Sequence, residues 1–467
     1  QSCRRMIYYL ATKNDRRGNA LSNPEIRDAR AETVLRADVL VAGAGAAGVA
    51  AATTAARQGC SVVIVERHGF AGGAAVAGLS GTVCGLYSAT NAPGRRPEQI
   101  VFGFADEFMH MMRARGGLTD AVVYGHTLTH VHDPLAWREA GDHLLTGAGV
   151  TILFHADIVS VLAEGDHIQG VIASSRGERL RIEAKVTIDA TGDAALAAMA
   201  GLPFTVGDGG RVQNPTMIFR LAGVDVPRFL AAYGEDSIMP APVSEAIAAA
   251  HKAGTHTLPR TKIFLFPTPR AGELLCNCTR LIGADGRELN PLSPRDLAEA
   301  EIAGRRQVRE YARFFRERLV GCEASYVNDT GVEVGVRQTR QIDGVGRLTN
   351  KDVLSARKPA SGIARSAWPI ELHSGEKPKL HWILDDYYEV PFEAFVPVRG
   401  EGLLAAGRCL SAEHEAMASA RVTAQCFSYG HALGHAAAMS AKGNMPARAV
   451  SPADLRDALN RDGARLT

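Results

Sequence analysis

Short apolar runs alternate with longer stretches of helical spacing along this chain. An apolar run at 37–42 is followed by small residues at 46–58 and by a second apolar run at 61–65. Apolar runs of about four to eight residues are typical of buried strands, whereas longer periodic stretches favour helices. The pattern therefore predicts a strand, a helix and a second strand, which begin an α/β fold.

The same criteria predict further elements along the rest of the chain. A capping side chain precedes a proline at three expected helix starts, which are Asp133 with Pro134, Ser293 with Pro294, and Ser451 with Pro452. Helices are expected at 98–115, 134–146, 294–319 and 416–441, and a short one after 452. Strands are expected at 150–154, 158–163, 168–174, 185–189, 216–221, 261–266, 273–279 and 402–406.

The turn after the first strand carries Gly43, Gly45 and Gly48, spaced as G-x-G-x-x-G, and the second strand ends at Glu66. In such a turn the first glycine permits the tight bend, the second lets the backbone approach a pyrophosphate, and the third lets the helix pack on the strand. The helix N-terminus offers free N–H groups to phosphates. A carboxylate at Glu66 can accept the ribose hydroxyls. These residues predict a dinucleotide site, for which both NAD and FAD are suitable.

Composition and charge indicate the number of domains and the classes of partner that are not expected. A chain of 467 residues is too long for one core, so two domains are expected. The net charge of +2 gives no reason to expect a nucleic-acid partner. No apolar stretch reaches the ~18 residues of a membrane span. The eight cysteines have neither disulfide nor metal spacing, which favours reduced thiols, a cytoplasmic location and no metal centre.

The first residues resemble a twin-arginine export signal, with Arg4 and Arg5 before an apolar run at 6–10. That run is shorter than the ~7–15 residues of an export signal, so export is the less favoured alternative. Residues 1–36 are expected to form an N-terminal arm.

The elements of the dinucleotide fold lie in separated parts of the chain. We expect a discontinuous domain of residues 37–204 plus 396–445, interrupted by an α+β substrate or cap domain at 205–395 and followed by a C-terminal helix at 446–467. A split nucleotide domain with a returning last strand is typical of flavoproteins of the glutathione-reductase type. The predicted fold class is therefore α/β, with a Rossmann-like FAD-binding domain.

Five motifs in order resemble those of bacterial FAD-dependent oxidoreductases related to the flavoprotein subunit of fumarate reductase and succinate dehydrogenase. They are AGAGAAG with Glu66, the Gly72-Gly73 doublet, VTIDATGDAALAAMAG, VGVRQTRQIDG at 334–344, and LLAAGRCLSAEHEAMASARV at 403–422. The resemblance covers residues 33–462 and implies FAD as the cofactor.

The resemblance also implies cofactor contacts. The pyrophosphate is expected at Gly43, Gly45, Ala46, Ala47 and Gly48, the ribose at Glu66 and Arg67, the adenine at Asp157 and Ile158, and the ribityl or flavin edge at Gly72, Gly73 and Ala74. Ala190, Thr191, Gly192 and Asp193 would close over the pyrophosphate side, and Gly407 and Arg408 would meet the ribityl chain. The N-terminus of the 416–441 helix would point at the flavin pyrimidine, which is anionic when reduced.

Two features of fumarate reductase and succinate dehydrogenase are not matched in this sequence. A histidine before their glycine doublet holds the flavin covalently, but His68 stands four residues before Gly72, which is a different spacing. Non-covalent FAD is therefore expected. The arginine and histidine set that binds C4-dicarboxylates is not recognisable either, so fumarate and succinate are not expected as substrates.

Four residues are candidates for the chemistry, because a flavin enzyme must orient its substrate and move a proton. His414, in the loop before the last long helix, could be the acid/base, or it could have a structural or ribityl role. Arg337 and Arg340 could clamp a carboxylate, or form a salt bridge between domains. Cys84 could be a redox-active thiol or a flavin tether, or simply a small buried residue.

Together these expectations predict an FAD-dependent oxidoreductase that transfers a hydride between flavin N5 and a small-molecule substrate. A flavin-dependent monooxygenase is one alternative. A non-redox FAD-binding protein, or a flavoprotein subunit of a larger complex, is another. The external electron donor or acceptor stays open, and the chain could form a homo-oligomer.

Overall fold

The computed structural model describes residues 32–373 and 379–466. The twin-arginine pattern lies outside the described residues. Within the part that is described, no helix is both long and apolar enough to cross a membrane.

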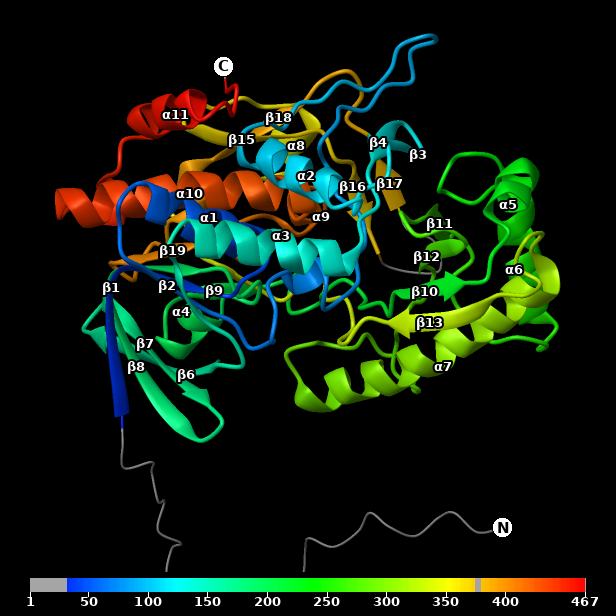
Figure 1. The fold of residues 1–467 in the computed structure, drawn as a ribbon, viewed down its shortest axis with the longest axis horizontal. Helices are drawn as coiled ribbons and strands as arrows, with labels where there is room; N and C mark the ends of the chain where they lie inside the picture. The colour runs from blue at the N-terminus through cyan, green and yellow to red at the C-terminus, as the bar shows by residue number, and fades with distance from the viewer. Residues whose placement is uncertain (1–31, 374–378, 467) are drawn as a thin grey trace, which may run out of the picture.

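A seven-stranded mixed sheet forms the centre of the larger part of the molecule (Figure 1). Its strands are β1 (Glu32–Ala42), β2 (Val62–Val65), β5 (Thr151–Leu153), β6 (Asp157–Glu164), β7 (His167–Ser175), β8 (Glu178–Asp189) and β19 (Leu403–Ala405). The strand order is β5-β2-β1-β8-β7-β6, and β19 pairs with the last residues of β8. The pairs among β5, β2, β1, β8 and β19 are parallel, whereas β6, β7 and the first half of β8 form an antiparallel meander.

The parallel strands are buried on both faces. Val39 and Val41 belong to one core cluster, whereas Leu40 and Ala42 belong to another on the opposite face, as the twofold alternation of a strand requires. In Figure 1, α1 (Ala46–Arg57), α3 (Pro134–Gly147) and α10 (Thr423–Gly443) lie together on one side of the sheet. The outer helices there are α2 (Phe104–Ala114) and α11 (Pro452–Arg461).

A second, smaller part holds an antiparallel sheet of order β11-β12-β10-β13 (Figure 1, right). Its strands are β10 (Phe219–Ala222), β11 (Phe264–Pro267), β12 (Glu273–Asn277) and β13 (Tyr326–Thr330). Helices α5 (Val226–Tyr233), α6 (Ala241–Lys252) and α7 (Pro294–Arg318) pack around it. Its core is separate from that of the large sheet. The predicted α/β fold class, with a Rossmann-like domain and a second domain, is confirmed.

Shorter elements complete the fold. The strands are β3 (Val122–Tyr124), β4 (Thr127–Thr129), β9 (Phe204–Val206), β14 (Arg340–Ile342), β15 (Gly362–Ser366), β16 (Ile370–Leu372), β17 (Lys379–His381) and β18 (Tyr388–Pro391), and the helices are α4 (Ala195–Met199), α8 (Asn350–Leu354) and α9 (His414–Ala420). Short 3-10 turns lie at Gly73–Ala75, Phe392–Phe395, Gly407–Cys409 and Ala447–Ala449.

The smaller part of the molecule ends earlier in the chain than the expected boundary at residue 395. Leu348, Val353 and Phe395 contribute to the core beside α1 and α10, whereas the core of the smaller part ends at Val334. The segment 348–396 is therefore packed with the nucleotide-binding part, because β15 and β16 lie against α10 and α9.

Three expected boundaries also differ. The expected helix at 416–441 is two helices, because Val422 is extended, with ψ of 166°, and caps α10. Residues 32–36 do not belong to an arm, since β1 pairs with β8 from Glu32 onward. Helix α2 begins only at Phe104. By contrast, the expected cap of α3 is confirmed, because the Asp133 carboxylate accepts the N–H of Leu135 at 2.8 Å.

Candidate functional site

The turn after β1 brings the start of α1 to the edge of a large cavity. Gly43 has a φ of 96°, a value that favours glycine. A Cβ on Gly48 would lie only 1.8 Å from the carbonyl oxygen of Gly43. Gly45 caps α1 without a side-chain hydrogen bond, so the first N–H groups of the helix remain available to an anion. This geometry fits a pyrophosphate-binding turn.

Glu66 directly follows β2 beside this turn, and backbone N–H groups hold its buried carboxylate in place. Its Oε2 accepts the N–H of Ala44 at 2.7 Å, and its Oε1 accepts the N–H of His68 at 2.9 Å. A carboxylate has about four lone-pair sites, so acceptor capacity remains for ribose hydroxyls. Glu66 also lines the cavity.

The segment after β8 forms another wall of the cavity. Buried Asp189 accepts the hydroxyl of Thr191 at 2.6 Å, which holds the turn. Arg408, from the loop after β19, places Nη2 3.6 Å from the Asp193 carboxylate. A Cβ on Gly192 would lie 2.6 Å from that Nη2, so glycine makes room for the guanidinium group. The buried Nε of Arg408 has no hydrogen-bond partner among the described residues, which makes it a donor suited to a cofactor oxygen.

One cavity joins these residues to the smaller part of the molecule. Its empty space, with the open mouth included, is ≈ 1530 Å³, above the roughly 300–1,000 Å³ of common small-molecule pockets. The predicted cofactor residues that line it are Gly43, Gly45, Ala46, Ala47, Glu66, Arg67, Gly72, Gly73, Ala74, Ala190, Thr191, Gly192, Asp193, Gly407 and Arg408. A long cofactor therefore has one continuous bed, from the phosphate turn onward.

Polar and charged side chains line the rest of this cavity. They come from the loop after the glycine doublet, from the smaller sheet, from β16 and its flanks, and from the break between α9 and α10. They are Thr82, Cys84, Thr216, Asn277, Arg337, Trp368, Glu371, His373, Arg421 and Thr423. A substrate beside the cofactor would meet these groups.

Glu371 is the centre of a hydrogen-bonded group. Its Oε1 accepts the Tyr124 hydroxyl at 3.1 Å and lies 3.0 Å from Nε2 of His373, and its Oε2 accepts the indole N–H of Trp368 at 3.3 Å. Burial alone would raise the pKa of Glu371. The interactions with His373 and with the guanidinium groups of Arg421 and Arg337 instead hold that pKa well below its usual range. Burial, together with the positive charge of Arg337, lowers the pKa of His373 to about 3. At neutral pH the pair is thus a carboxylate and a neutral imidazole.

Arg337, which is buried, and Arg421, which is partly buried, bring two guanidinium groups to the same chamber. Arg337 donates to the Asn214 carbonyl at 2.6 Å, and Arg421 donates to the Gln213 side chain at 3.2 Å. Burial lowers the pKa of Arg421 to about 10 and that of Arg337 well below its ordinary value. Glu371 is the carboxylate that acts on both. Because burial penalises charge without a counter-ion, two guanidinium groups around one carboxylate leave room for an added anion.

Two of the four chemistry candidates, Arg337 and Cys84, line the cavity. Burial raises the pKa of the Cys84 thiol to about 12. Its Sγ lies 3.2 Å from the Thr82 hydroxyl and 3.6 Å from that of Thr129. The thiol is therefore protonated near neutral pH, which leaves little nucleophilic thiolate.

The other two candidates, His414 and Arg340, are not among the lining residues. His414 begins α9, and the helix break places Thr423, rather than the start of α9, in the cavity wall. Arg340 lies in β14, with its guanidinium 5.5 Å from the Phe204 ring. Residues 336–339 belong to no helix, so Arg337 and Arg340 do not lie on one helical turn, and only Arg337 reaches the cavity.

Three of the predicted cofactor residues, Gly48, Asp157 and Ile158, do not line the cavity. Gly48 packs against the backbone of Gly43 instead. Beside Glu66 the wall is instead formed by Arg67, His68 and Glu333. Arg67 forms an ion pair with Glu333, and Nε2 of His68 lies 3.6 Å from the same carboxylate. The loop before the VGVRQTR motif therefore reaches the ribose end of the site, a contact that the sequence did not suggest.

Sequence reasoning also missed Glu371, His373 and Arg421. A signal existed for the first two, since an acid and a histidine two residues apart on a strand share a face. Arg421 lies within the fifth motif but appeared to be part of a continuous helix. Its role in the cavity depends on the break at Val422.

Comparison with known proteins gives the family. The family described as FAD dependent oxidoreductase matches residues 38–459. No curated protein matches the chain. Similar solved structures include p-nitrophenol 4-monooxygenase PnpA from Pseudomonas putida DLL-E4, with 11% identity, 93% of this chain and 85% of that chain covered, and a TM-score of 0.49. A geranylgeranyl bacteriochlorophyll reductase-like protein from Thermoplasma acidophilum has 13% identity, coverage of 92% and 83%, and a TM-score of 0.48.

The flavin-dependent brominase Bmp2 has 12% identity, coverage of 91% and 84%, and a TM-score of 0.48. Likenesses this distant assign no reaction to the present chain. The family match, by contrast, spans nearly the whole chain and includes both halves of the cofactor bed. This protein therefore belongs to the FAD dependent oxidoreductase family and is an oxidoreductase with FAD as its cofactor.

Proposed function

We propose that this enzyme transfers a hydride between FAD and a small organic anion, most simply a carboxylate. The observation that carries the proposal is a pair of guanidinium groups, of buried Arg337 and partly buried Arg421, in the cavity that also holds the cofactor residues. The closer relationship to the fumarate reductase group, which the five motifs suggested, is part of this proposal, because the matching family is broader than that group.

The cofactor bed fits FAD, held without a covalent bond. A Cβ on Gly73 would lie 2.9 Å from Cα of Gly45, so the glycine doublet and the phosphate turn are in close backbone contact. Bound FAD supplies the hydride acceptor or donor at its N5. The protein must then hold the substrate and handle one proton.

The two arginines are suited to holding the substrate anion. Each keeps unused N–H donors, since a guanidinium group has five. The Nε of Arg421 is buried and has no partner among the described residues. Charge-assisted, bidentate hydrogen bonds to a carboxylate are among the strongest available to a side chain. An anion here would also offset the charge that burial penalises.

The pair Glu371 and His373 is suited to moving the proton. The carboxylate, 3.0 Å from Nε2 of His373, orients the imidazole as a buried acid orients a catalytic histidine. The imidazole is neutral at neutral pH, so the ring nitrogen that does not face Glu371 keeps a lone pair for a proton released when substrate is oxidised. A bound substrate anion would offset the Arg337 charge that lowers the pKa of His373, and would thereby make the imidazole a stronger base. We assign proton transfer to His373, and the orienting role to Glu371.

The test is anaerobic titration of the FAD-loaded enzyme with small acids and with their methyl esters, followed by flavin absorbance. The panel includes 2-hydroxy acids, amino acids and saturated carboxylates. The reverse direction uses chemically reduced enzyme and unsaturated carboxylates. We expect an acid to change the flavin redox state while its ester does not. Equal reaction with acid and ester would overturn the anion assignment.

A flavin-dependent monooxygenase remains the second candidate, and the same experiment separates the two. A monooxygenase would be reduced by NAD(P)H rather than by the substrate, and would place an atom of labelled dioxygen in the product. That outcome would overturn hydride transfer to or from the substrate while leaving the anion site intact. Membership in the oxidoreductase family argues against the non-redox alternative.

A further inference from the structure

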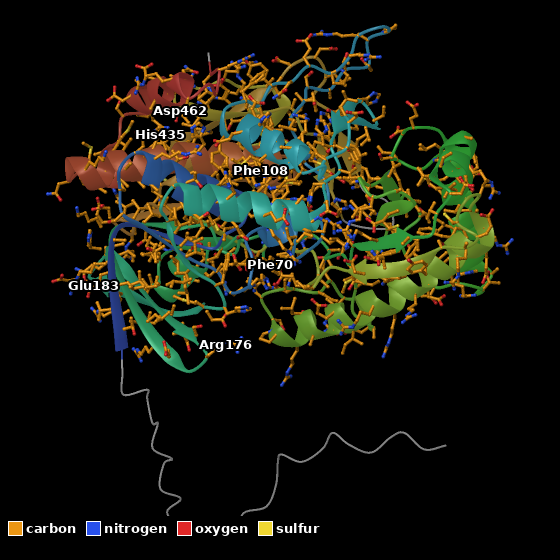
Figure 2. The ribbon with its side chains drawn as sticks, in the orientation of Figure 1. Phe70, Phe108, Arg176, Glu183, His435 and Asp462 are labelled. Carbon is orange, nitrogen blue, oxygen red and sulfur yellow. The ribbon has the colours of Figure 1, made fainter. Side chains whose placement is uncertain are left out.

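A group of two histidines and one aspartate lies away from the FAD cavity, between α10 and the end of α11. Figure 2 shows His435 and Asp462 beside each other at this junction. His431 and His435 are four residues apart on α10, so their imidazoles share one face of the helix. Asp462 is the residue that caps the C-terminus of α11. The His431, His435 and Asp462 side chains are named here the α10–α11 triad.

The donor atoms of this triad converge. Nε2 of His431 lies 3.1 Å from Oδ2 of Asp462, and Nε2 of His435 lies 2.8 Å from the same oxygen. One ligand atom from each of the three residues lies within 4.8 Å of the other two. In a tetrahedral zinc site with bonds of about 2.0–2.1 Å, neighbouring ligand atoms are about 3.3 Å apart. Each imidazole nitrogen would need to move only a few tenths of an ångström away from the Asp462 oxygen. The two nitrogens, which lie within 4.8 Å of each other, would need to approach by at most about 1.5 Å to reach the same spacing.

From this convergence we propose that the α10–α11 triad binds a divalent transition metal ion of the zinc type. Two imidazole nitrogens and one carboxylate oxygen are ligands that suit Zn²⁺ and its first-row neighbours. They do not suit Mg²⁺ or Ca²⁺, which prefer oxygen ligands. With three protein ligands, water would complete the coordination.

The surroundings allow such an ion to enter and be held. The side chains of both histidines are nearly buried, with 6% and 4% exposed, whereas that of Asp462 is 42% exposed. A small cleft lined by His435 and Asp462 opens at this point, which provides an entry path and space for water. Of the nearby cations, Arg57 is paired with Glu107 at 2.7 Å, whereas Lys442 and Arg461 line the cleft itself.

The ion would have a structural role. His431 and His435 belong to the helix whose N-terminus lines the FAD cavity, whereas Asp462 ends the C-terminal helix. An ion held by both elements would fix α11 against α10. Because it would bind the folded chain and not the unfolded one, it would raise the melting temperature.

The test uses the untagged, FAD-loaded enzyme, stripped with a chelator and dialysed against ZnCl₂. Metal per chain is measured by elemental analysis, and CoCl₂ serves as a visible spectroscopic probe. The test variants are Asp462→Asn and His435→Gln. The matched controls are Asp457→Asn, an exposed acid in α11, and His110→Gln, an exposed histidine in α2. Flavin content and melting temperature confirm that each variant is folded.

We expect one Zn²⁺ per chain in the wild type and in both controls, and an affinity loss of about tenfold or more in the test variants. Zinc at about a hundredfold excess over Kd should raise the wild-type melting temperature by roughly 3 °C. Asp462→Asn changes a partly exposed side chain, so it keeps the test valid even if His435→Gln does not fold. Absence of zinc binding in the wild type, or equal binding in Asp462→Asn, would show that the triad is only a hydrogen-bonded tie, and would overturn the proposal.

Discussion

Gly430 of α10 packs directly on the backbone of Ala47 in α1, since a Cβ on Gly430 would lie 2.0 Å from the Ala47 carbonyl oxygen. One turn later, a Cβ on Gly434 would lie 2.6 Å from the carbonyl oxygen of Ala51. Helix α1 begins at the phosphate turn, and α10 begins at Thr423, which lines the cavity. The glycine contact therefore fixes the spacing of the two helix N-termini around the cofactor.

Replacing Gly430 with alanine should destabilise the protein and weaken FAD retention. The added methyl group meets backbone, which cannot rotate away, so a cost of about 1–3 kcal/mol is expected. Thermal unfolding and flavin content after gel filtration measure the two effects. Gly147→Ala in α3 is the matched control, because nothing lies within 4 Å of the Cβ it would add. A Gly430→Ala protein as stable as the control would contradict the close helix contact.

Replacing Glu66 with glutamine should reduce FAD affinity by about 10- to 100-fold, because hydrogen bonds to a charged acceptor contribute about 1.5–3 kcal/mol. Glutamine retains the size of the side chain but loses the charge and one acceptor oxygen. Fluorescence titration of the stripped protein with FAD measures the change. Glu178→Gln, at an exposed position in β8, is the control. Unchanged affinity in Glu66→Gln would exclude a ribose contact at this position.

The phosphate turn could be predicted from the sequence because its determinants are local. Gly43, Gly48 and Glu66 belong to one strand–helix–strand unit, and its geometry follows from backbone sterics. The chamber around Glu371 could not be predicted in the same way. It depends on β16, on Arg337, which lies far from β16 in the sequence, and on the break at Val422, which brings Arg421 into the cavity wall.

His414 illustrates the same limit. Its place in the chain, before the last long helix, suggested a position beside the flavin, and that inference required one continuous helix. The extended conformation of Val422 interrupts the helix and places Thr423 at the cavity. Local helix propensity does not report such a break, since Ala420, Arg421 and Ala424 favour a helix and the β-branched Val422 and Thr423 lower the propensity only slightly.

Replacing Arg421 with methionine should weaken binding of an anionic substrate by about 10- to 100-fold, the usual effect of losing a charge-assisted hydrogen bond. Binding of a neutral ester of the same acid should change little. The dissociation constants come from perturbation of flavin absorbance under anaerobic conditions. Arg228→Met, which removes an exposed arginine, is the control. Equal losses for acid and ester would indicate a packing role for Arg421 and no anion contact.

Replacing His373 with glutamine should leave FAD bound but lower kcat by about 10²- to 10⁴-fold, the usual contribution of general acid–base catalysis. His414→Gln should have little effect, because His414 does not line the cavity. Stopped-flow flavin reduction, with flavin content measured on the same samples, distinguishes catalysis from cofactor loss. The opposite ranking of the two variants would restore His414 as the acid/base.

Stability should fall as pH decreases from 7.5 to 5.5, in part because of His373. The pKa of this histidine is about 3 in the folded protein, against about 6.5 in an unfolded chain. Below pH 6.5 the unfolded chain binds a proton that the folded protein does not, so protonation favours unfolding. The stability contribution is complete above pH 6.5 and is lost progressively as the pH falls toward 3. At pH 5.5 the loss attributable to this one group is about 1 kcal/mol.

Melting temperatures of the FAD-loaded wild type and His373→Gln, each measured at pH 7.5 and 5.5, test this dependence. Glutamine does not titrate, so the variant should lose less stability on acidification than the wild type. Glu371, whose pKa is also lowered, contributes only below its unfolded value of about 4.3, which lies outside this window. His132, whose pKa burial lowers to about 4, is present in both proteins, and its effect cancels in the comparison. The same loss in both proteins would mean that the pKa of His373 is not lowered in the fold, and would contradict its burial as a neutral imidazole beside Arg337.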